Sequence, residues 1–232
     1  MNVLAVICAR SGSERLAAKH HQKIGASPMW LIARDAAVKS GMKKHIVVST
    51  DDNEILWTAG VTNTLARRRP EALADSKASI HWALVDALQW VESLVLAGKR
   101  RHYDAVACIP ANVPTVTAAV LDACVDALRK TQDATAAMTV KPVSEHPEWM
   151  WSCEGGFLSR TGTSKAYRMQ DLPERFIATG TCCVVRRSTL LKCKTQAAYR
   201  WLGDRIVPVV ETGPVIEVHD ANDLELARRI LT

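Results

Sequence analysis

The chain opens with an apolar strand that runs directly into a basic loop of small residues. Residues 3–8 read VLAVIC, so every side chain of the expected strand is apolar and the strand is predicted to be buried. Residues 9–16 follow as ARSGSERL, in which Gly12 and the serines allow backbone amides to approach an anion. Positive charge around this loop comes from Arg10, Arg15 and Lys19. Such a strand end is where an open α/β sheet binds phosphates, and no GxxxxGK[ST] follows it, which argues against a kinase-type P-loop.

Strand and helix patterns alternate along the rest of the chain, which predicts an α/β fold with a mostly parallel sheet. Further strands are expected at residues 45–50, 103–109, 133–140, 181–185, 206–210 and 214–219. Helices are expected at residues 29–39, directly after 51–54, from about 76 to 91, and at 118–130 and 221–231. Their expected N-caps are Ser27, Asp75 or Ser76, Thr117 and Asp220.

Residues 141–178 have a different character, because prolines, glycines and aromatic residues mix there without a helical period. Two short runs around Gly155-Gly156 suggest a β-hairpin. We therefore expect one domain over residues 1–232, with 141–178 inserted as an arm.

Composition narrows the classes of protein that are compatible with the chain. The 232 residues are 48% hydrophobic and carry a formal charge of +6, but no Lys/Arg stripe is interleaved with aromatic residues, so nucleic acid is not an expected partner. Seven cysteines without a CxxC pair suggest reduced thiols rather than a zinc site. No leader-like segment and no run of membrane-spanning length is seen, so a cytoplasmic protein without membrane contact is expected.

Six sequence blocks, in order along the chain, resemble those of the CMP-sugar synthetases. These are the acylneuraminate cytidylyltransferases and their relatives that act on other nonulosonic acids; the 3-deoxy-manno-octulosonate cytidylyltransferases are more distantly similar. The blocks are ARSGSERL (9–16), VVSTDD (47–52), RPEALAD (69–75), EHPEWMW (145–151), RMQDLP (168–173) and DANDL (220–224).

The resemblance implies a Rossmann-like nucleotidyltransferase with a small hairpin dimerisation arm, acting as a homodimer. It implies transfer of CMP from CTP to an acidic sugar, release of pyrophosphate and a divalent metal, with Mg²⁺ expected and Mn²⁺ as the alternative. The implied catalytic residues are Arg10 and Lys19. The implied nucleotide-binding residues are Ala9, Arg10, Ser11, Gly12, Arg15, Lys19, Arg69, Ser79 and Asn112. The implied substrate-binding residues are Arg168, Gln170 and Thr179, and the implied metal ligands are Glu217, His219 and Asn112.

The chain departs from the family pattern at several of these positions. Glu14 stands where acylneuraminate enzymes usually have Lys, and Asn112 replaces an Asp found in other nucleotidyltransferases. The sequence 217–219 reads Glu-Val-His instead of Asp-Ile-Asp, and Ile177 replaces an Arg. Two alternatives therefore stay open: the same fold with another nucleotide or acceptor, and a catalytically weakened nucleotide-binding paralogue. The adjacent His20-His21 pair is expected to be exposed to solvent or to contact phosphate.

Overall fold

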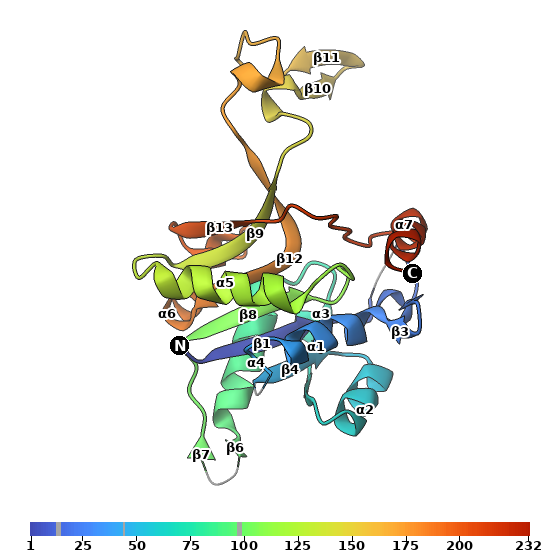
Figure 1. The fold of residues 1–232 in the computed structure, drawn as a ribbon, viewed down its shortest axis with the longest axis vertical. Coiled ribbons are helices and arrows are strands. Elements are labelled where there is room, and N and C mark those ends of the chain that lie inside the picture. The colour runs from blue at the N-terminus through green and yellow to red at the C-terminus, as the bar shows by residue number, and fades with distance from the viewer. Residues whose placement is uncertain (13–14, 44, 97–98) are drawn as a thin grey trace.

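A mixed seven-stranded sheet forms the centre of the protein in a computed structural model that describes residues 1–12, 15–43, 45–96 and 99–232 (Figure 1). Glu14 lies outside the described residues. The strand order is β13-β9-β12-β8-β1-β4-β5, and only β12 runs antiparallel to its neighbours within this sheet. The strands are β1 (Val3–Cys8), β4 (Ile46–Thr50), β5 (Leu65–Arg68), β8 (Ala105–Pro110), β9 (Ala136–Pro142), β12 (Phe176–Arg186) and β13 (Ile206–Val210). The predicted α/β fold with a mostly parallel sheet is confirmed.

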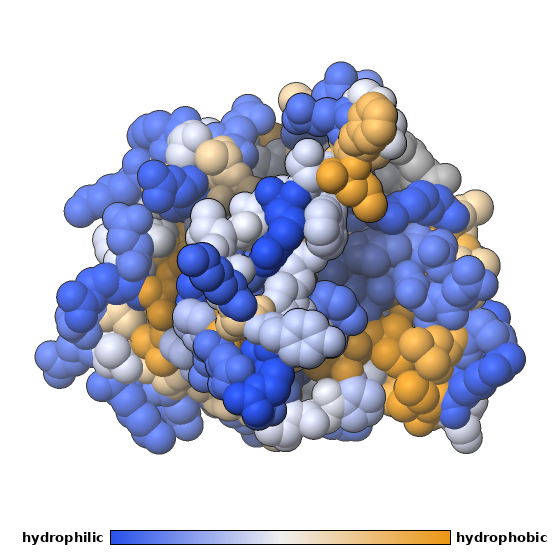
Figure 2. Space-filling view, turned by 90° about the horizontal axis from the view of Figure 1, so that it is seen from above, coloured by the Kyte–Doolittle hydropathy of each residue, from blue (hydrophilic) through white to orange (hydrophobic). Residues whose placement is uncertain are grey.

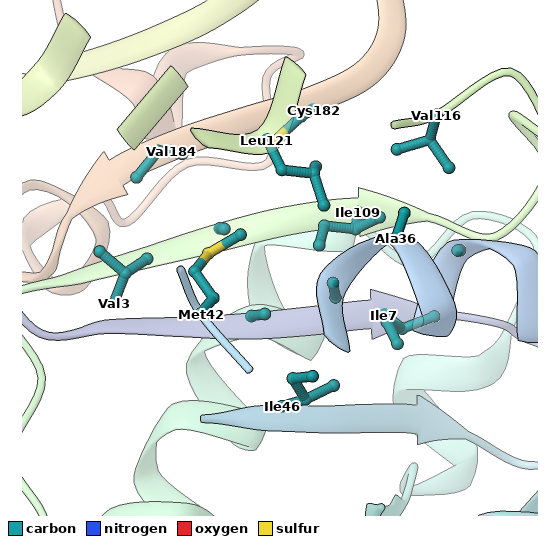
Figure 3. Close-up of a cluster of buried hydrophobic side chains, with 14 of the residues drawn as sticks. Val3, Ile7, Ala36, Met42, Ile46, Ile109, Val116, Leu121, Cys182 and Val184 are labelled. Atoms are coloured by element: carbon teal, nitrogen blue, oxygen red, sulfur yellow. The ribbon is translucent and has the colours of Figure 1, made fainter. Parts of the chain in front are cut away.

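Helices cover both faces of the sheet, which explains why β1 is apolar throughout. Alternate residues of β1 point to opposite faces. Val3 and Ile7 belong to one cluster with helices α1 (Met29–Lys39) and α5 (Ala118–Lys130) (Figure 3), whereas Leu4 and Val6 belong to the other with α4 (Ile80–Ser93). The helices are α1 (Met29–Lys39), α2 (Asn53–Val61), α3 (Glu71–Ala74), α4 (Ile80–Ser93), α5 (Ala118–Lys130), α6 (Arg187–Lys192) and α7 (Ala221–Leu231). No helix among the described residues is both long and apolar enough to cross a membrane.

Short strand pairs and single 3-10 turns complete the fold. Two-residue strands pair as β2 (Lys23–Ile24) with β3 (Ser27–Pro28) and as β6 (Val95–Leu96) with β7 (Lys99–Arg100). Single 3-10 turns are η1 (Lys19–His21), η2 (Pro147–Trp149), η3 (Met169–Asp171) and η4 (Arg200–Leu202).

Two predicted helix caps are confirmed and two are wrong. Thr117 and Asp220 cap α5 and α7, and Asp220 forms a capping box with Asp223. Helix α1 begins after Pro28 rather than after Ser27, which pairs in β3. Helix α4 is capped by Ser79, because the earlier candidate Asp75 is used in a turn, where its Oδ1 accepts from the backbone of Lys77 at 2.7 Å.

The prediction of a strand at residues 214–219 is wrong. This segment pairs with no strand of the sheet. Its backbone instead crosses the sheet end, where Val218 N donates to Asn112 O at 2.8 Å and Ile216 N donates to Thr115 Oγ1 at 3.2 Å. Strand β5 was not predicted, because the arginines of Leu65–Arg68 resemble a solvated loop; at the sheet edge such charged residues are common.

The predicted hairpin is present in residues 141–178. Strands β10 (Trp151–Glu154) and β11 (Phe157–Arg160) pair antiparallel, with both turn glycines at positive φ. The hairpin stands well away from the sheet, at the end of the long extensions of β9 and β12 (Figure 1). Seen from above, hydrophobic side chains form separate patches among hydrophilic ones (Figure 2). Exposed aromatic side chains on the hairpin include Trp151 and Phe157, which are 56% and 78% exposed.

Candidate active site

The basic loop after β1 is held in place by the next strand of the sheet. Ala9 is buried and its N–H donates to Ser49 O at 3.1 Å. Both the backbone N–H and the hydroxyl of Ser11 donate to the carboxylate of Asp51, the former at 2.7 Å. Burial acts to raise the pKa of Asp51, but these hydrogen bonds outweigh it, so the pKa is lowered. Ser11 therefore fixes the loop through an ionised carboxylate.

Four cations converge on a cavity of about 350 Å³ at the carboxyl ends of β1 and β8. They are Arg10, Arg15, Lys19 and Arg69. The same cavity is lined by Gly12, His20, Asn112, Glu217 and His219. Burial, and then the like charge of Arg15, lowers the pKa of Lys19. A polyanion in this cavity would relieve that repulsion, so its electrostatics favour a phosphate chain.

Arg69 is the most buried of these cations, at 6% exposure. It follows β5, and its guanidinium donates to Ser49, from Nε to Oγ at 3.1 Å and from Nη2 to the carbonyl oxygen at 2.9 Å. In the described part of the chain, no carboxylate lies within 4 Å to form an ion pair with it. Asp51 interacts with the charge of Arg69 only from beyond ion-pair distance, so the buried charge is partly compensated, and an anionic ligand would complete the compensation.

His20 also lines the cation-lined cavity. Its Nδ1 is buried and has no hydrogen-bond partner among the described residues. Burial, together with the neighbouring charge of Lys19, lowers the pKa of His20 to about 4, so the imidazole is neutral at pH 7. His21 points elsewhere, with Nε2 2.8 Å from Asp52 Oδ2. Of the two alternatives expected for this pair, solvent exposure does not hold for the His20 imidazole, whereas contact with phosphate stays a prediction.

The three predicted metal ligands come together at the sheet end. Glu217 Oε2 lies 3.4 Å from His219 Nε2, and Glu217 Oε1 accepts from Asn112 Nδ2 at 3.3 Å. Within the described residues, no group of three or more His, Cys, Asp or Glu side chains could hold a metal alone. Mg²⁺ is usually bound by one or two carboxylates together with phosphate oxygens and water. The single carboxylate of Glu217 therefore fits a cation that is bound jointly with a triphosphate.

A second cavity of about 430 Å³ adjoins the first and shares Ile80, Pro110 and Glu217 with it. Its wall comes from β8, β9, β12 and the segment before η4. Most of the lining is apolar or carries a thiol, including Met138, Ala178, Cys108, Cys182, Cys183 and Trp201. Glu217 thus lies between a cation-lined cavity and a mostly apolar one, where two substrates could meet.

The remaining predicted site residues lie outside the cation-lined cavity. Ser79 caps α4, with its Oγ 3.4 Å from His81 N, and lines the second cavity. Thr179 is buried, and its hydroxyl bonds to Thr139 Oγ1 at 2.7 Å and to Glu211, so it stabilises the sheet interior. Arg168 and Gln170 lie on the arm, where Arg168 pairs with Asp171. One chain brings neither arm residue to the two cavities.

Comparisons with known proteins agree with this geometry. The model of the family described as Cytidylyltransferase matches residues 4–153, and the chain belongs to that family. N-acylneuraminate cytidylyltransferase of Streptococcus agalactiae serotype V is 27% identical over 209 residues, which cover 84% of this chain and 46% of the relative. Pseudaminic acid cytidylyltransferase of Campylobacter jejuni is 30% identical over 122 residues, or 52% of this chain and 50% of the relative.

The chain thus spans about half the length of these curated relatives. Among solved structures, CMP:2-keto-3-deoxy-manno-octonic acid synthetase complexed with CTP is similar, with a TM-score of 0.71 and 18% identity. That match covers 99% of this chain and 98% of the other. The Rossmann-like nucleotidyltransferase fold and the resemblance to the CMP-sugar synthetases are confirmed.

Proposed function

We propose that this protein is a cytidylyltransferase that transfers CMP from CTP to an acidic sugar and releases pyrophosphate. The observation that carries the proposal is Arg69, a buried cation that forms no ion pair within 4 Å in the described chain, in a cavity lined by three further cations. The names of the curated relatives support cytidine as the base and a nonulosonic acid as the acceptor.

In the proposed reaction, a hydroxyl oxygen of the acceptor bonds to the α-phosphorus of CTP. The bond from that phosphorus to the α–β bridging oxygen breaks, pyrophosphate leaves with the electron pair, and the hydroxyl proton passes to solvent. Arg10 and Lys19 offset the charge that develops on the leaving pyrophosphate. The cation-lined cavity holds the nucleotide, and the second cavity holds the acceptor, so that the two meet beside Glu217.

A divalent cation belongs to this proposal, with Mg²⁺ expected and Mn²⁺ as the alternative. Glu217, with Asn112 and His219 beside it, would hold the cation jointly with the phosphates. When bound, such a cation neutralises phosphate charge and polarises the phosphoryl group that is transferred. Imidazole suits Mn²⁺ better than Mg²⁺, so His219 favours some activity with Mn²⁺.

We further propose a homodimer in which the arm, residues 141–178, contacts a second subunit. Apolar side chains of the hairpin are exposed in the single chain, including Leu158 at 67%. Aromatic residues are enriched in protein interfaces, which supports this role. In such a dimer Arg168 and Gln170 would reach the acceptor bound to the other subunit. A reducing, cytoplasmic location is proposed because all seven cysteines are free.

A ligand-induced stability measurement tests the proposal without knowledge of the acceptor. The unfolding temperature is measured with CTP, UTP, ATP or GTP, each in Mg²⁺, Mn²⁺ or EDTA, because a ligand that binds only the folded state raises it. A metal-dependent increase with CTP alone supports the proposal, and pyrophosphate release with acidic sugars then measures turnover. If another nucleotide raises the unfolding temperature instead, that nucleotide rather than CTP is the substrate. If CTP binds but no pyrophosphate is released, the catalytically weakened paralogue is favoured.

The matched variants for this experiment are Arg10→Ala and Arg129→Ala. Arg129 is exposed on α5, where it pairs with Asp126 at 2.7 Å. Loss of the response to CTP in Arg10→Ala but not in Arg129→Ala supports the phosphate-binding role. An equal response in both variants contradicts it.

A further inference from the structure

Three cysteines from three neighbouring strands lie on one face of the central sheet. Cys8 ends β1, Cys108 lies in β8 and Cys183 lies in β12, and these strands are adjacent in the order β12-β8-β1. Cys108 pairs with Val6, and Cys8 follows two residues later along β1, so Cys8 points to the same face as Val6. All three side chains belong to or pack against the hydrophobic cluster that includes α4. All three are free thiols, so the sheet gathers three oxidisable sulfur atoms there.

Cys108 and Cys183 are directly opposite each other in an antiparallel pair of strands. The pairing of β8 with β12 ends at these two residues, next to the bulge of β12. Opposite residues in such a ladder have Cα atoms about 4.5 or 5.5 Å apart, depending on whether they share hydrogen bonds. Both distances lie in the range of a disulfide bond, about 4.4–6.8 Å. The backbone therefore holds these two cysteines at a spacing that a disulfide can bridge.

The second cavity gives a small molecule access to this pair. Cys183 is partly exposed, whereas Cys108 is buried, and both line this cavity. Hydrogen bonding with the Cys183 thiol, and also burial, raise the pKa of Cys108 well above its usual value, so this thiol stays protonated at neutral pH. Because the thiolate is the nucleophile, a reagent in the cavity reacts first with Cys183.

The remaining cysteines of the chain are placed differently. Cys182 and Cys124 contact each other in the cluster on the opposite face of the sheet, and both are buried. Cys153 is exposed on the hairpin, and Cys193 follows α6, where its Sγ donates to Thr195 O at 3.5 Å. Neither Cys153 nor Cys193 is among the described residues that line the second cavity. Cys193 is therefore a control for reaction at a cysteine outside the cavity.

We propose that Cys183 is a modification site for small disulfide molecules, and that its modification ends in a reversible disulfide bond with Cys108. In the first step the Cys183 thiolate attacks one sulfur of the small disulfide, so a mixed disulfide forms and a small thiolate leaves. The Cys108 sulfur then attacks Cys183 Sγ, the second small thiolate leaves, and the proton of Cys108 passes to it. Two protein thiols are thereby oxidised, and one small disulfide is reduced to two thiols.

The disulfide is expected to slow turnover rather than to prevent nucleotide binding, and this consequence rests on the proposed cytidylyltransferase function. The bridge would shift β12 at its bulge, where Gly180 lies beside the carboxylate of Glu217. Glu217 would then move away from the place where the two substrates meet. Arg10 and Arg69 follow β1 and β5, which the bridge does not join, so binding of CTP should be retained.

The purified protein is treated with 2-hydroxyethyl disulfide, a small symmetrical disulfide. The remaining thiols are alkylated, and linked peptides are identified by mass spectrometry without reduction. Pyrophosphate release and the Kd for CTP are measured before treatment, after treatment, and after a second reduction with dithiothreitol. The variants are Cys183→Ala, Cys108→Ala and, as the matched control, Cys193→Ala, each compared with its own reduced form.

In the wild type and in Cys193→Ala we expect a peptide in which Cys108 and Cys183 are linked. Cys108→Ala should stop at the mixed disulfide on Cys183, and Cys183→Ala should leave Cys108 free and keep its own reduced rate. Oxidation of the wild type should lower turnover about tenfold or more, because a small displacement of a reacting group is costly. Dithiothreitol should restore the rate, and the Kd for CTP should stay unchanged.

Absence of the linked peptide, or linkage of another pair such as Cys124 with Cys182, overturns the proposed site. Since Cys183 is partly exposed, Cys183→Ala decides the assignment even if Cys108→Ala does not fold. The linked peptide with unchanged turnover overturns the effect on turnover and leaves the modification site standing. If the reduced wild type releases no pyrophosphate with any acidic sugar, the proposed function fails, whereas the linked peptide still decides the modification site.

Discussion

The backbone of Gly180 packs directly against the carboxylate of Glu217. A Cβ atom at Gly180 would lie 3.1 Å from Glu217 Oε2, closer than most real Cβ contacts. Gly180 has a φ of 73° and lies in a bulge of β12, where residues 179–182 stand opposite Thr139 of β9. The hydroxyl of Thr139 closes the bulge by accepting from Cys182 N at 3.1 Å. A bulge in one strand thus sets the position of a carboxylate on another segment.

This relationship predicts that Gly180→Ala impairs turnover as well as stability. The left-handed backbone should cost about 1–2 kcal/mol of unfolding free energy, and the added methyl group should displace Glu217. Gly156→Ala is the matched control, because Gly156 has a φ of 83° but nothing within 4 Å of the added atom. Urea unfolding and pyrophosphate release are measured for both. Equal turnover in the two variants would show that the contact with Glu217 has no functional role.

Arg69→Met is predicted to separate ligand binding from folding. Removal of a buried cation that forms no close ion pair relieves a desolvation cost, whereas its two hydrogen bonds to Ser49 are lost. We therefore expect the free protein to unfold within a few degrees of the wild type. A charge-assisted contact contributes about 1.5–3 kcal/mol, so the Kd for CTP should rise at least about tenfold. Calorimetric titration with CTP checks this, and unchanged affinity would remove Arg69 from the nucleotide site.

The sequence was sufficient for those parts of the fold and site that depend on local chemistry. The all-apolar run Val3–Cys8 predicted a strand buried on both faces, and the cations Arg10, Arg15 and Lys19 do line one cavity. Thr117 and Asp220 were recognised as caps because the capping hydrogen bonds join residues two or three apart in sequence.

Long-range contacts account for what the sequence did not reveal. The segment at residues 214–219 has a strand-like pattern, but its backbone partners lie about a hundred residues away, and they tie it across the sheet end. The substrate-binding role of Thr179 stays a prediction; its bonds to Thr139 and Glu211 form where β12 bulges against β9, a contact that the local sequence does not show. The left-handed backbone of Tyr199 likewise depends on buried neighbours, and no local signal marks it.

The lowered pKa of His20 predicts that part of the unfolding free energy is lost at acid pH. Its pKa falls from 6.5 to about 4 in the folded protein, so the unfolded chain binds the additional proton between these values. Stability from this residue is therefore complete above about pH 6.5 and is lost as the pH falls toward 4, by on the order of 2–3 kcal/mol. In His20→Asn, the unfolding free energy measured with urea should depend less on pH between pH 4.5 and 7 than it does in the wild type. His102→Asn is the control, since its side chain is 70% exposed; the same slope in both variants would contradict the assignment.

The substitution Glu217→Gln is predicted to change the dependence of turnover on Mg²⁺, and not only the affinity for the nucleotide. Glutamine keeps the shape of the side chain and can still contact Asn112, but it removes the one carboxylate of the predicted metal site. Since charge dominates binding of a hard cation, the Mg²⁺ concentration for half-maximal pyrophosphate release should rise about tenfold or more, and excess Mg²⁺ should restore part of the rate.

Glu225→Gln supplies the control for this experiment, because Glu225 is an exposed residue of α7 that pairs only with Arg229 within the described chain. Its Mg²⁺ dependence should match that of the wild type. If Glu217→Gln also leaves the Mg²⁺ dependence unchanged, Glu217 does not hold the cation. In that case the Glu217 side chain, which lies between the two cavities, would act on the acceptor directly. A loss of turnover that excess Mg²⁺ does not restore would identify this role.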